Sequence, residues 1–361
     1  MRIRPLAFIL IASLFCSPAI AGDPPGQHAE AAENSAFVPN PDAFHLAVRP
    51  DGKSLIIAHR GASGYLPEHT LAAYAAAYFM GADVIEPDVV LTKDGVPICS
   101  HDLTLDSTTD VAEKFPGRAR DDGEHYAIDF TLAEIKTLEN LGREGRVRQH
   151  GHSVVTLDEM IALVQSLNAS TGRNVGVIPE PKSPSFHRAE GRPIERPLID
   201  TLTRHGYTDR SDACVIQCFE FDALRVFRND LNTDLSLCYL FSETDKAEPM
   251  ENVALICDSI SARKDILVER RSPISIAQSP NTPRDTAAAH GLAVYTWTFE
   301  SDIPYMVNAN HDGLAGYFTN YTDSGVTARD LATRLLEPDS PGREQAIEAV
   351  LSYLAAGFEP E

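Results

Sequence analysis

The sequence has 361 residues, 52 of them acidic and 31 basic, and its formal net charge is −21 at pH 7. This length suits one large α/β barrel with insertions, and the negative charge argues against nucleic acid or an anionic membrane as a partner. Six cysteines are present, and loss of the first would leave an odd number, so the sequence implies no complete disulfide framework.

The first 21 residues have the pattern of a signal peptide. Arg2 and Arg4 precede an apolar run from Leu6 to Phe15, and Ala19-Ile20-Ala21 matches the small residues before a cleavage site. We therefore expect cleavage near Ala21 and a periplasmic or secreted protein without a stable membrane anchor. Cys16 leaves lipidation as an alternative. Residues 22–50 lack periodicity and predict an extended arm.

Short apolar runs alternate with helical patterns from Ser54 onward, which favours βα units. Nine candidate strands can be counted, about the eight that close a (β/α)₈ TIM barrel, here placed at residues 51–325. The predicted strands are 55–58, 84–91, 97–99, 174–178, 214–219, 235–240, 258–262, 292–298 and 313–319. The predicted helices are 71–80, 132–138, 157–167, 197–205, 221–231 and 282–291.

Two segments lie outside this alternation. Residues 103–131, after the strand that ends at His101-Asp102, are polar and too long for an ordinary barrel loop, so we predict an insertion over one rim. Residues 326–361 contain two amphipathic segments, 328–336 and 343–355, and predict a helical extension on the outside of the barrel.

Acidic residues stand where strands end, which is where the active site of a TIM barrel forms. Glu86 and Asp88 are two residues apart on one strand and therefore point to the same face, and Glu180 ends a later strand. Converging carboxylates repel one another unless a cation neutralises them, and an all-oxygen set suits Ca²⁺, with Mg²⁺ as an alternative. Salt bridges with Arg60 and Lys182 are the competing explanation.

Two histidines share this rim. His59 follows the first strand and His101 follows the strand at 97–99. Phosphodiester cleavage needs one group that takes a proton and another that gives one, and histidines near neutral pKa suit both tasks. Arg60 and Lys182 supply positive charge for phosphate oxygens.

Several motifs together resemble the glycerophosphodiester phosphodiesterases, and specifically their periplasmic bacterial branch. The first is the run HRGASGYLPEHT from His59 to Thr70. The others are the segments 81–88, 101–102, 115–131, 184–191, 217–219 and 316–320. They occur in the family's order between about residues 50 and 325, which is far more specific than a single short motif.

The resemblance implies metal-dependent hydrolysis of glycerophosphodiesters to sn-glycerol 3-phosphate and an alcohol on a TIM barrel. It implies His59 and His101 as acid–base residues and a supporting role for Glu68. The implied metal ligands are Glu86, Asp88 and Glu180, and the implied phosphate-binding residues are Arg60 and Lys182. Gln217 and Trp297 are further candidates for substrate contact.

The sequence also allows two other functions for the same barrel. The same barrel could act like a phospholipase D on lysolipids, although the sequence contains no amphipathic basic segment for membrane docking, or it could be a non-catalytic surface-binding protein. We expect His69, His125 and His150 to His152 to be surface or helix-cap residues. Cys214 and Cys218 have no second cluster of Cys or His nearby, so we expect them to be buried as small hydrophobic residues.

Overall fold

Eight parallel strands form a barrel in the computed structural model, which describes residues 52–143, 146–268, 282–337 and 339–356. The order is β5-β2-β1-β11-β10-β9-β8-β7, and a parallel bridge between Val177 and Cys214 joins the two ends of the sheet. This confirms the TIM barrel. The strands are β1 (Leu55–His59), β2 (Val84–Glu86), β5 (Gly176–Val177), β7 (Val215–Cys218), β8 (Ser236–Phe241), β9 (Ser259–Arg263), β10 (Ala293–Phe299) and β11 (Gly316–Thr319).

Alternate residues of each strand face opposite sides of the barrel wall. Leu55 and Ile57 belong to the core inside the barrel, whereas Ile56 and Ala58 belong to the larger core between the wall and the helices. The barrel is therefore filled by side chains, and only the last residues of the strands are left to line an opening.

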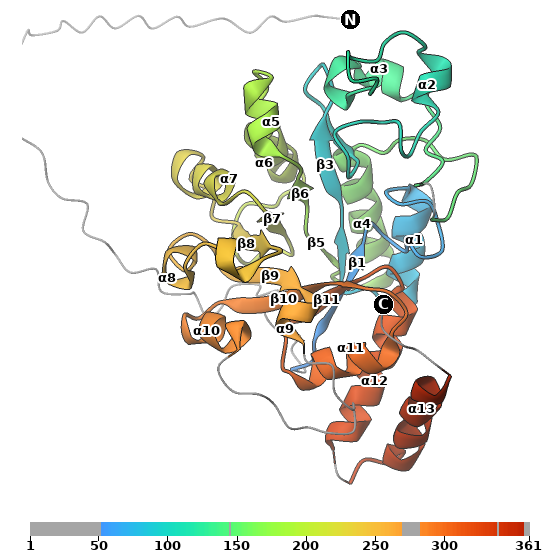
Figure 1. The fold of residues 1–361 in the computed structure, drawn as a ribbon, viewed down its shortest axis with the longest axis vertical. Coiled ribbons are helices and arrows are strands. Elements are labelled where there is room, and N and C mark those ends of the chain that lie inside the picture. The colour runs from blue at the N-terminus through green and yellow to red at the C-terminus, as the bar shows by residue number, and fades with distance from the viewer. Residues whose placement is uncertain (1–51, 144–145, 269–281, 338, 357–361) are drawn as a thin grey trace, which may run out of the picture. The chain divides into compact units, whose positions relative to one another are not determined.

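Helices surround the barrel (Figure 1). Thr70 and Thr156 cap the two helices that flank the first strands, α1 and α4, through their side chains. The helices are α1 (Leu71–Met80), α4 (Leu157–Thr171), α5 (Pro184–Ala189), α6 (Glu195–Arg204), α7 (Phe221–Arg225), α8 (Met250–Val253), α9 (Lys264–Leu267), α10 (Pro283–Ala289), α11 (Ile303–His311), α12 (Thr322–Leu336) and α13 (Arg343–Ala355), together with a π-helical turn at Val226–Asp230.

A second, three-stranded sheet rises from the barrel with the order β4-β3-β6. Its strands are β3 (Asp88–Leu91), β4 (Pro97–Cys99) and β6 (Glu180–Pro181). Pro87 separates β2 from β3, as expected of a residue that lacks a backbone donor. The strand predicted at 97–99 exists, but it pairs antiparallel with β3 and is therefore not a strand of the barrel.

The predicted insertion has a small core of its own. Val90 and Ile98 of the hairpin pack with Leu105, Phe130 and further residues up to Val154, so this core includes residues on both sides of the predicted segment 103–131. We therefore extend the insertion to the described residues between 103 and 154, which include α2 (Val111–Lys114), α3 (Leu132–Ile135) and a 3-10 turn at Ala127–Asp129. In Figure 1, α2 and α3 stand at the top, beyond the end of β3.

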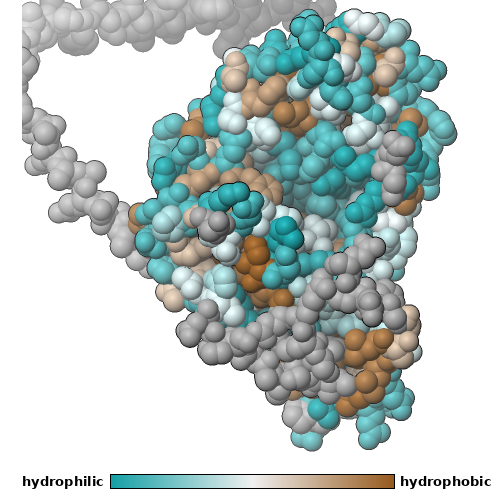
Figure 2. All heavy atoms as spheres, in the orientation of Figure 1, coloured by the Kyte–Doolittle hydropathy of each residue, from teal (hydrophilic) through white to brown (hydrophobic). Residues whose placement is uncertain are grey.

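Helix α12 packs against the outside of the barrel, and α13 packs against α11 and α12. Gly325, Ala328 and Leu331 of α12 are buried, and α12 contacts α1, α11 and β1. Leu351 and Leu354 of α13 are exposed. The face drawn in Figure 2 is mostly hydrophilic, with small hydrophobic patches, one of them near its lower end.

The predicted signal peptide, Cys16 and the arm at 22–50 lie outside the described residues. Every described residue belongs to one compact unit, residues 37–361. Within the described part of the chain, we find no helix with the length and apolar character needed to cross a membrane.

Candidate active site

The alternation of side chains along the strands places the candidate residues at one opening of the barrel. Val84, Ile178 and Tyr295 belong to the core inside the barrel. Glu86, Glu180 and Trp297 lie two residues further along, so they project to the same side one step beyond that core. The same relation connects Ile57 with His59 and Val215 with Gln217.

This opening is a pocket of about 480 Å³. Of the ten predicted site residues, only Glu68 is not among those that line it. The lining residues are His59, Arg60, Glu86, Asp88, His101, Glu180, Lys182, Gln217, Phe219, Leu240, Trp297, Thr298 and Phe318.

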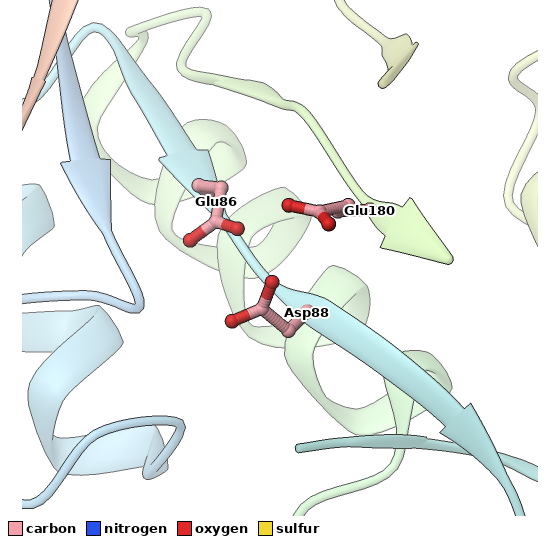
Figure 3. Close-up of side chains that lie close together, drawn as sticks. All are labelled: Glu86, Asp88 and Glu180. Carbon is pink, nitrogen blue, oxygen red and sulfur yellow. The ribbon is translucent and has the colours of Figure 1, made fainter. Parts of the chain in front are cut away.

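Three buried carboxylates meet at the bottom of the pocket. Glu86, Asp88 and Glu180 each offer an oxygen atom, and these atoms lie within 4.8 Å of one another. Figure 3 shows that the three side chains turn toward a common point, Glu86 and Asp88 from one continuous stretch of chain and Glu180 from its neighbour. The register of the sheet explains this approach, because Asp88 of β3 pairs with Glu180 of β6.

Two basic side chains balance part of this negative charge. Lys182 Nζ lies 2.6 Å from Glu180 Oε1 and 3.4 Å from Asp88 Oδ1, and Arg60 Nε lies 3.1 Å from Asp88 Oδ2. Burial raises the pKa of Asp88, but the charges of Lys182 and Arg60 outweigh this effect and hold that pKa well below its usual range. The alternative of salt bridges with Arg60 and Lys182 is thus part of the observed arrangement.

The balance is incomplete at the other two carboxylates. Burial, followed by the charge of Asp88, raises the pKa of Glu86 well above its usual range, and burial raises the pKa of Glu180 to about 7. Glu86 accepts hydrogen bonds only from uncharged donors among the described residues, namely the Arg60 backbone N–H at 2.7 Å and the Gln217 amide at 3.4 Å. Three converging carboxylates with a surplus of negative charge fit a hard divalent cation.

His59 is held by a neighbouring amide. Its Nδ1 lies 2.7 Å from Oδ1 of Asn320, while the amide nitrogen of Asn320 donates to Glu300 at 2.9 Å. Because the carboxylate of Glu300 requires the amide NH₂, the amide oxygen must face His59, which places the proton on Nδ1. Burial, together with the charge of Arg60, lowers the pKa of His59 to about 3, although part of the ring faces the pocket.

His101 approaches the same pocket from the small sheet. Its Nδ1 lies 2.5 Å from Oδ1 of Asp102. Burial raises the pKa of Asp102, but hydrogen bonds from His101, Arg143 and Ser107 hold it well below its usual range. His101 therefore has an ionised carboxylate behind its ring, whereas His59 has a neutral amide.

Glu68 lies just behind the pocket in a supporting position. It is buried, and its Oε1 lies 3.2 Å from Arg60 and 3.0 Å from Arg143. Arg60 has a positive φ, and Gly61 follows with φ +83°. A Cβ at Gly61 would lie 2.7 Å from the backbone carbon of Ala73, so this turn requires glycine.

Apolar side chains also line the pocket. Phe219 and Trp297 meet edge to face, with ring centroids 5.6 Å apart, and Leu240 and Phe318 are further lining residues. Gln217 is buried and turns its amide nitrogen toward Glu86. The pocket can thus hold both an anionic group and a carbon skeleton.

Two histidines correct the sequence analysis. His69 and His125 are buried, not surface or helix-cap residues. Nε2 of His69 lies 3.1 Å from Asp88 and its Nδ1 2.8 Å from the hydroxyl of Tyr74, and Nδ1 of His125 lies 2.7 Å from Asp106. Exposed His150 agrees with the prediction.

The cysteine predictions agree with the structure. Cys214 and Cys218 are buried without a disulfide, as are Cys99, Cys238 and Cys257. None of these five belongs to the candidate metal site.

Three functional neighbours were given no role from the sequence: Asn320, Phe219 and Arg143, although the motif segments 316–320 and 217–219 contain the first two. Asn320 and Phe219 follow β11 and β7 directly, so the rule of strand ends could have found them. Arg143 lies in the insertion and has no local signal.

Comparison with known proteins agrees with this geometry. The model of the glycerophosphoryl diester phosphodiesterase family matches residues 59–324. A glycerophosphodiester phosphodiesterase of Haemophilus influenzae is 34% identical over 325 residues, covering 75% of this chain and 88% of that protein. One from Caldanaerobacter subterraneus is 43% identical over 266 residues, covering 73% and 93%. A phosphodiesterase structure from Oleispira antarctica, in complex with the product sn-glycerol-3-phosphate, has a TM-score of 0.58 at 22% identity, covering 78% and 98%; it supports the fold.

Proposed function

The chain belongs to the glycerophosphoryl diester phosphodiesterase family and is an enzyme that hydrolyses glycerophosphodiesters, and from this premise we propose that it does so with a divalent cation and two histidines. The observation that carries the proposal is the single pocket in which His59 and His101 line the same opening as three converging carboxylates. The expected products are sn-glycerol 3-phosphate and an alcohol.

His59 is the general base in this proposal. The hydrogen bond to Asn320 keeps the proton on Nδ1 and leaves the lone pair on Nε2. The low pKa of His59 keeps the ring neutral at physiological pH, and it also makes the ring a weaker base than the near-neutral histidine expected from the sequence. Its Nε2 accepts the proton of the attacking oxygen as the new P–O bond forms. That oxygen belongs to water, or to the glycerol hydroxyl, in which case water opens the cyclic phosphate in a second step.

His101 is the general acid. The carboxylate of Asp102 stabilises a positive charge on the His101 ring. The protonated ring can then give a proton to the departing alkoxide oxygen as the old P–O bond breaks, which balances the proton taken by His59.

The remaining residues hold the phosphate and the cation. Glu86, Asp88 and Glu180 would bind the cation, for which we propose Ca²⁺ because a flexible carboxylate set suits its larger radius better than that of Mg²⁺. When bound, the cation would supply positive charge to the phosphoryl oxygens. Arg60 and Lys182 line the pocket beside these carboxylates and offer charged donors to those oxygens.

We also propose that the protein is exported and belongs to the periplasmic branch of the family. The support is the sequence pattern of residues 1–21 and the motifs 115–131 and 184–191. Mass spectrometry of the protein recovered from its native host tests this proposal. A mature N-terminus near Gly22 is expected, and an intact Met1 in the mature protein would contradict it.

Phosphorus NMR of glycerophosphocholine turnover tests the proposed chemistry. Wild-type protein should release sn-glycerol 3-phosphate, chelation with EDTA should stop the reaction, and added Ca²⁺ should restore it. A cyclic phosphate, if one forms, would appear in the same spectra. Faster turnover of micellar lysolipid would support a phospholipase, and no turnover of either substrate would support a binding protein. Full activity after exhaustive chelation would contradict the role of the cation.

A further inference from the structure

Arg143 connects two carboxylates that stand behind the pocket. One of its guanidinium nitrogens lies 2.8 Å from Asp102 Oδ2, and the other terminal nitrogen lies 3.0 Å from Glu68 Oε1. Each of these acids contacts a residue that lines the pocket, Asp102 through His101 and Glu68 through Arg60. Arg143 itself does not line the pocket.

The resulting chain of alternating charges runs from the insertion to the barrel. It continues from Arg60 to Asp88, whose Oδ2 lies 3.1 Å from Arg60 Nε. The planar guanidinium suits this position, because its two ends can hold two carboxylates in fixed directions, which an ammonium group cannot do. Arg143 thus fixes His101, which comes from the small sheet, relative to Arg60, which follows the first barrel strand.

The backbone around Arg143 is itself anchored. Asn140 donates from its side chain to the backbone carbonyl of Glu68 at 3.0 Å, and it accepts from the backbone N–H of Gly142 at 3.0 Å. Gly142 has φ +77°, and a Cβ there would lie 2.3 Å from the carbonyl oxygen of Val147. The loop is therefore seated tightly against the segment that carries Glu68.

Burial distinguishes the ion pairs of Arg143 from the other ion pair made by this loop. The side chains of Arg143, Glu68 and Asp102 are 26%, 8% and 27% exposed, whereas those of Arg146 and Glu300 are 47% and 43% exposed. Water screens an exposed pair and competes for its hydrogen bonds, so the Arg143 pairs are the ones that can hold a fixed geometry.

We propose that Arg143 is a positioning residue that, through Asp102, aims His101 at the oxygen of the leaving alcohol. The proposal rests on the function proposed above, in which His101 gives a proton to that oxygen. Arg143 and Ser107, the latter at 2.6 Å, both donate to the second oxygen of Asp102 while its first oxygen contacts His101. Loss of Arg143 would leave only the Ser107 hydroxyl on that oxygen among the described residues, and the carboxylate would orient the His101 ring less strictly.

A comparison of two leaving groups tests the role of Arg143. Choline leaves glycerophosphocholine as a poor leaving group and needs a proton, whereas p-nitrophenol leaves the p-nitrophenyl ester of glycerol 3-phosphate without one. Arg143→Met should lower kcat for glycerophosphocholine by about 10- to 100-fold, the loss expected from a misplaced acid. The same variant should lower kcat for the p-nitrophenyl ester by less than about threefold, since general acid catalysis contributes little there.

Arg120→Met is the matched control. Arg120 lies in the same insertion and also bridges two carboxylates, Asp129 at 2.7 Å and Glu190 at 2.8 Å. Unlike the acids held by Arg143, these two form no ion pair, among the described residues, with a residue that lines the pocket. Arg120→Met should change kcat for glycerophosphocholine and kcat for the p-nitrophenyl ester by the same factor. Arg143→Lys keeps the positive charge but not the two-ended guanidinium, so it should recover only part of the lost rate. If Arg143→Met does not fold, Arg143→Lys provides the same comparison of the two substrates.

Each outcome decides the question. Equal losses on both substrates, or no loss with glycerophosphocholine, would overturn the role of Arg143 while leaving the proposed function intact. Failure of the wild-type protein to hydrolyse glycerophosphocholine at all would instead contradict the proposed function, so the two failures are distinguishable.

Discussion

Calcium binding to the three carboxylates should release protons, and the affinity should therefore rise with pH. Two unit charges within 4.8 Å of each other repel by at least about 3 kcal/mol at an effective dielectric constant of 20. This repulsion adds to the effect of burial, which raises the pKa of Glu86 well above its usual range and that of Glu180 to about 7. A cation must displace the protons that these groups hold.

The magnitude follows from the pKa of Glu180. A carboxyl with a pKa of about 7 is about 90% protonated at pH 6 and about 10% protonated at pH 8, so its proton alone should weaken calcium binding about tenfold at pH 6 relative to pH 8. Glu86, with its pKa raised in the same direction, should steepen this dependence.

Titration calorimetry at pH 6, 7 and 8 measures this effect, and buffers with different ionisation enthalpies count the released protons. Glu180→Gln keeps the shape of the side chain but removes the titrating group. Its calcium affinity at pH 8 should fall by at least about 10- to 100-fold, since loss of even an outer-shell partner has that effect, and its pH dependence should be shallower.

Glu220→Gln is the matched control for Glu180→Gln. Glu220 follows β7, lies near the same rim and pairs with Ser185 and Arg188, outside the three-carboxylate group. Its calcium affinity should match that of the wild type. A wild-type calcium affinity that is constant between pH 6 and 8 would refute calcium binding to protonated carboxylates at this site. Calcium binding by Glu180→Gln with wild-type affinity would refute it as well.

Three further changes test other parts of the structure. His101→Ala should lower turnover of glycerophosphocholine by about 10²- to 10⁴-fold with little change in Tm; near-normal rates would contradict its role. Burial lowers the pKa of His187 to about 4, so the folded state disfavours its protonation and up to about 3 kcal/mol of stability should be lost as pH falls from 6.5 to 4. Urea unfolding of His187→Phe should show a smaller loss of unfolding free energy between pH 6.5 and pH 4. Identical pH profiles of the variant and the wild type would exclude His187 as the cause of that loss. Gly61→Ala should cost at least about 2 kcal/mol in the same unfolding assay, more than Gly123→Ala, which has a similar φ but open space around its Cβ; equal costs would show that the clash is relieved.

The sequence was sufficient for the barrel and for most of the pocket. Strand periodicity is local, so the position of Glu86 two residues beyond Val84 already places both on the inside face. The closure of parallel strands into a barrel then brings their carboxyl ends together. His59, Glu86, Glu180, Gln217 and Trp297 all reach the pocket by this rule.

Tertiary structure decided what this rule does not cover. The segment at 97–99 has the composition of a barrel strand, but hydrogen bonds to β3 make it one arm of an antiparallel hairpin. His101 therefore reaches the pocket from outside the barrel. His69 carries no periodic signal, and only its contact with Asp88 shows that it is buried against the site.

The electrostatic state of the site also depends on contacts that are distant in sequence. His59 and Asn320 are 261 residues apart, and Arg143 and Glu68 are 75 residues apart. Residue types and strand parity determined which groups are present and which way they face. Only the folded chain determined which carboxylates are paired, which nitrogen of His59 carries the proton and what stands behind His101, because burial and charge act through space and not along the sequence.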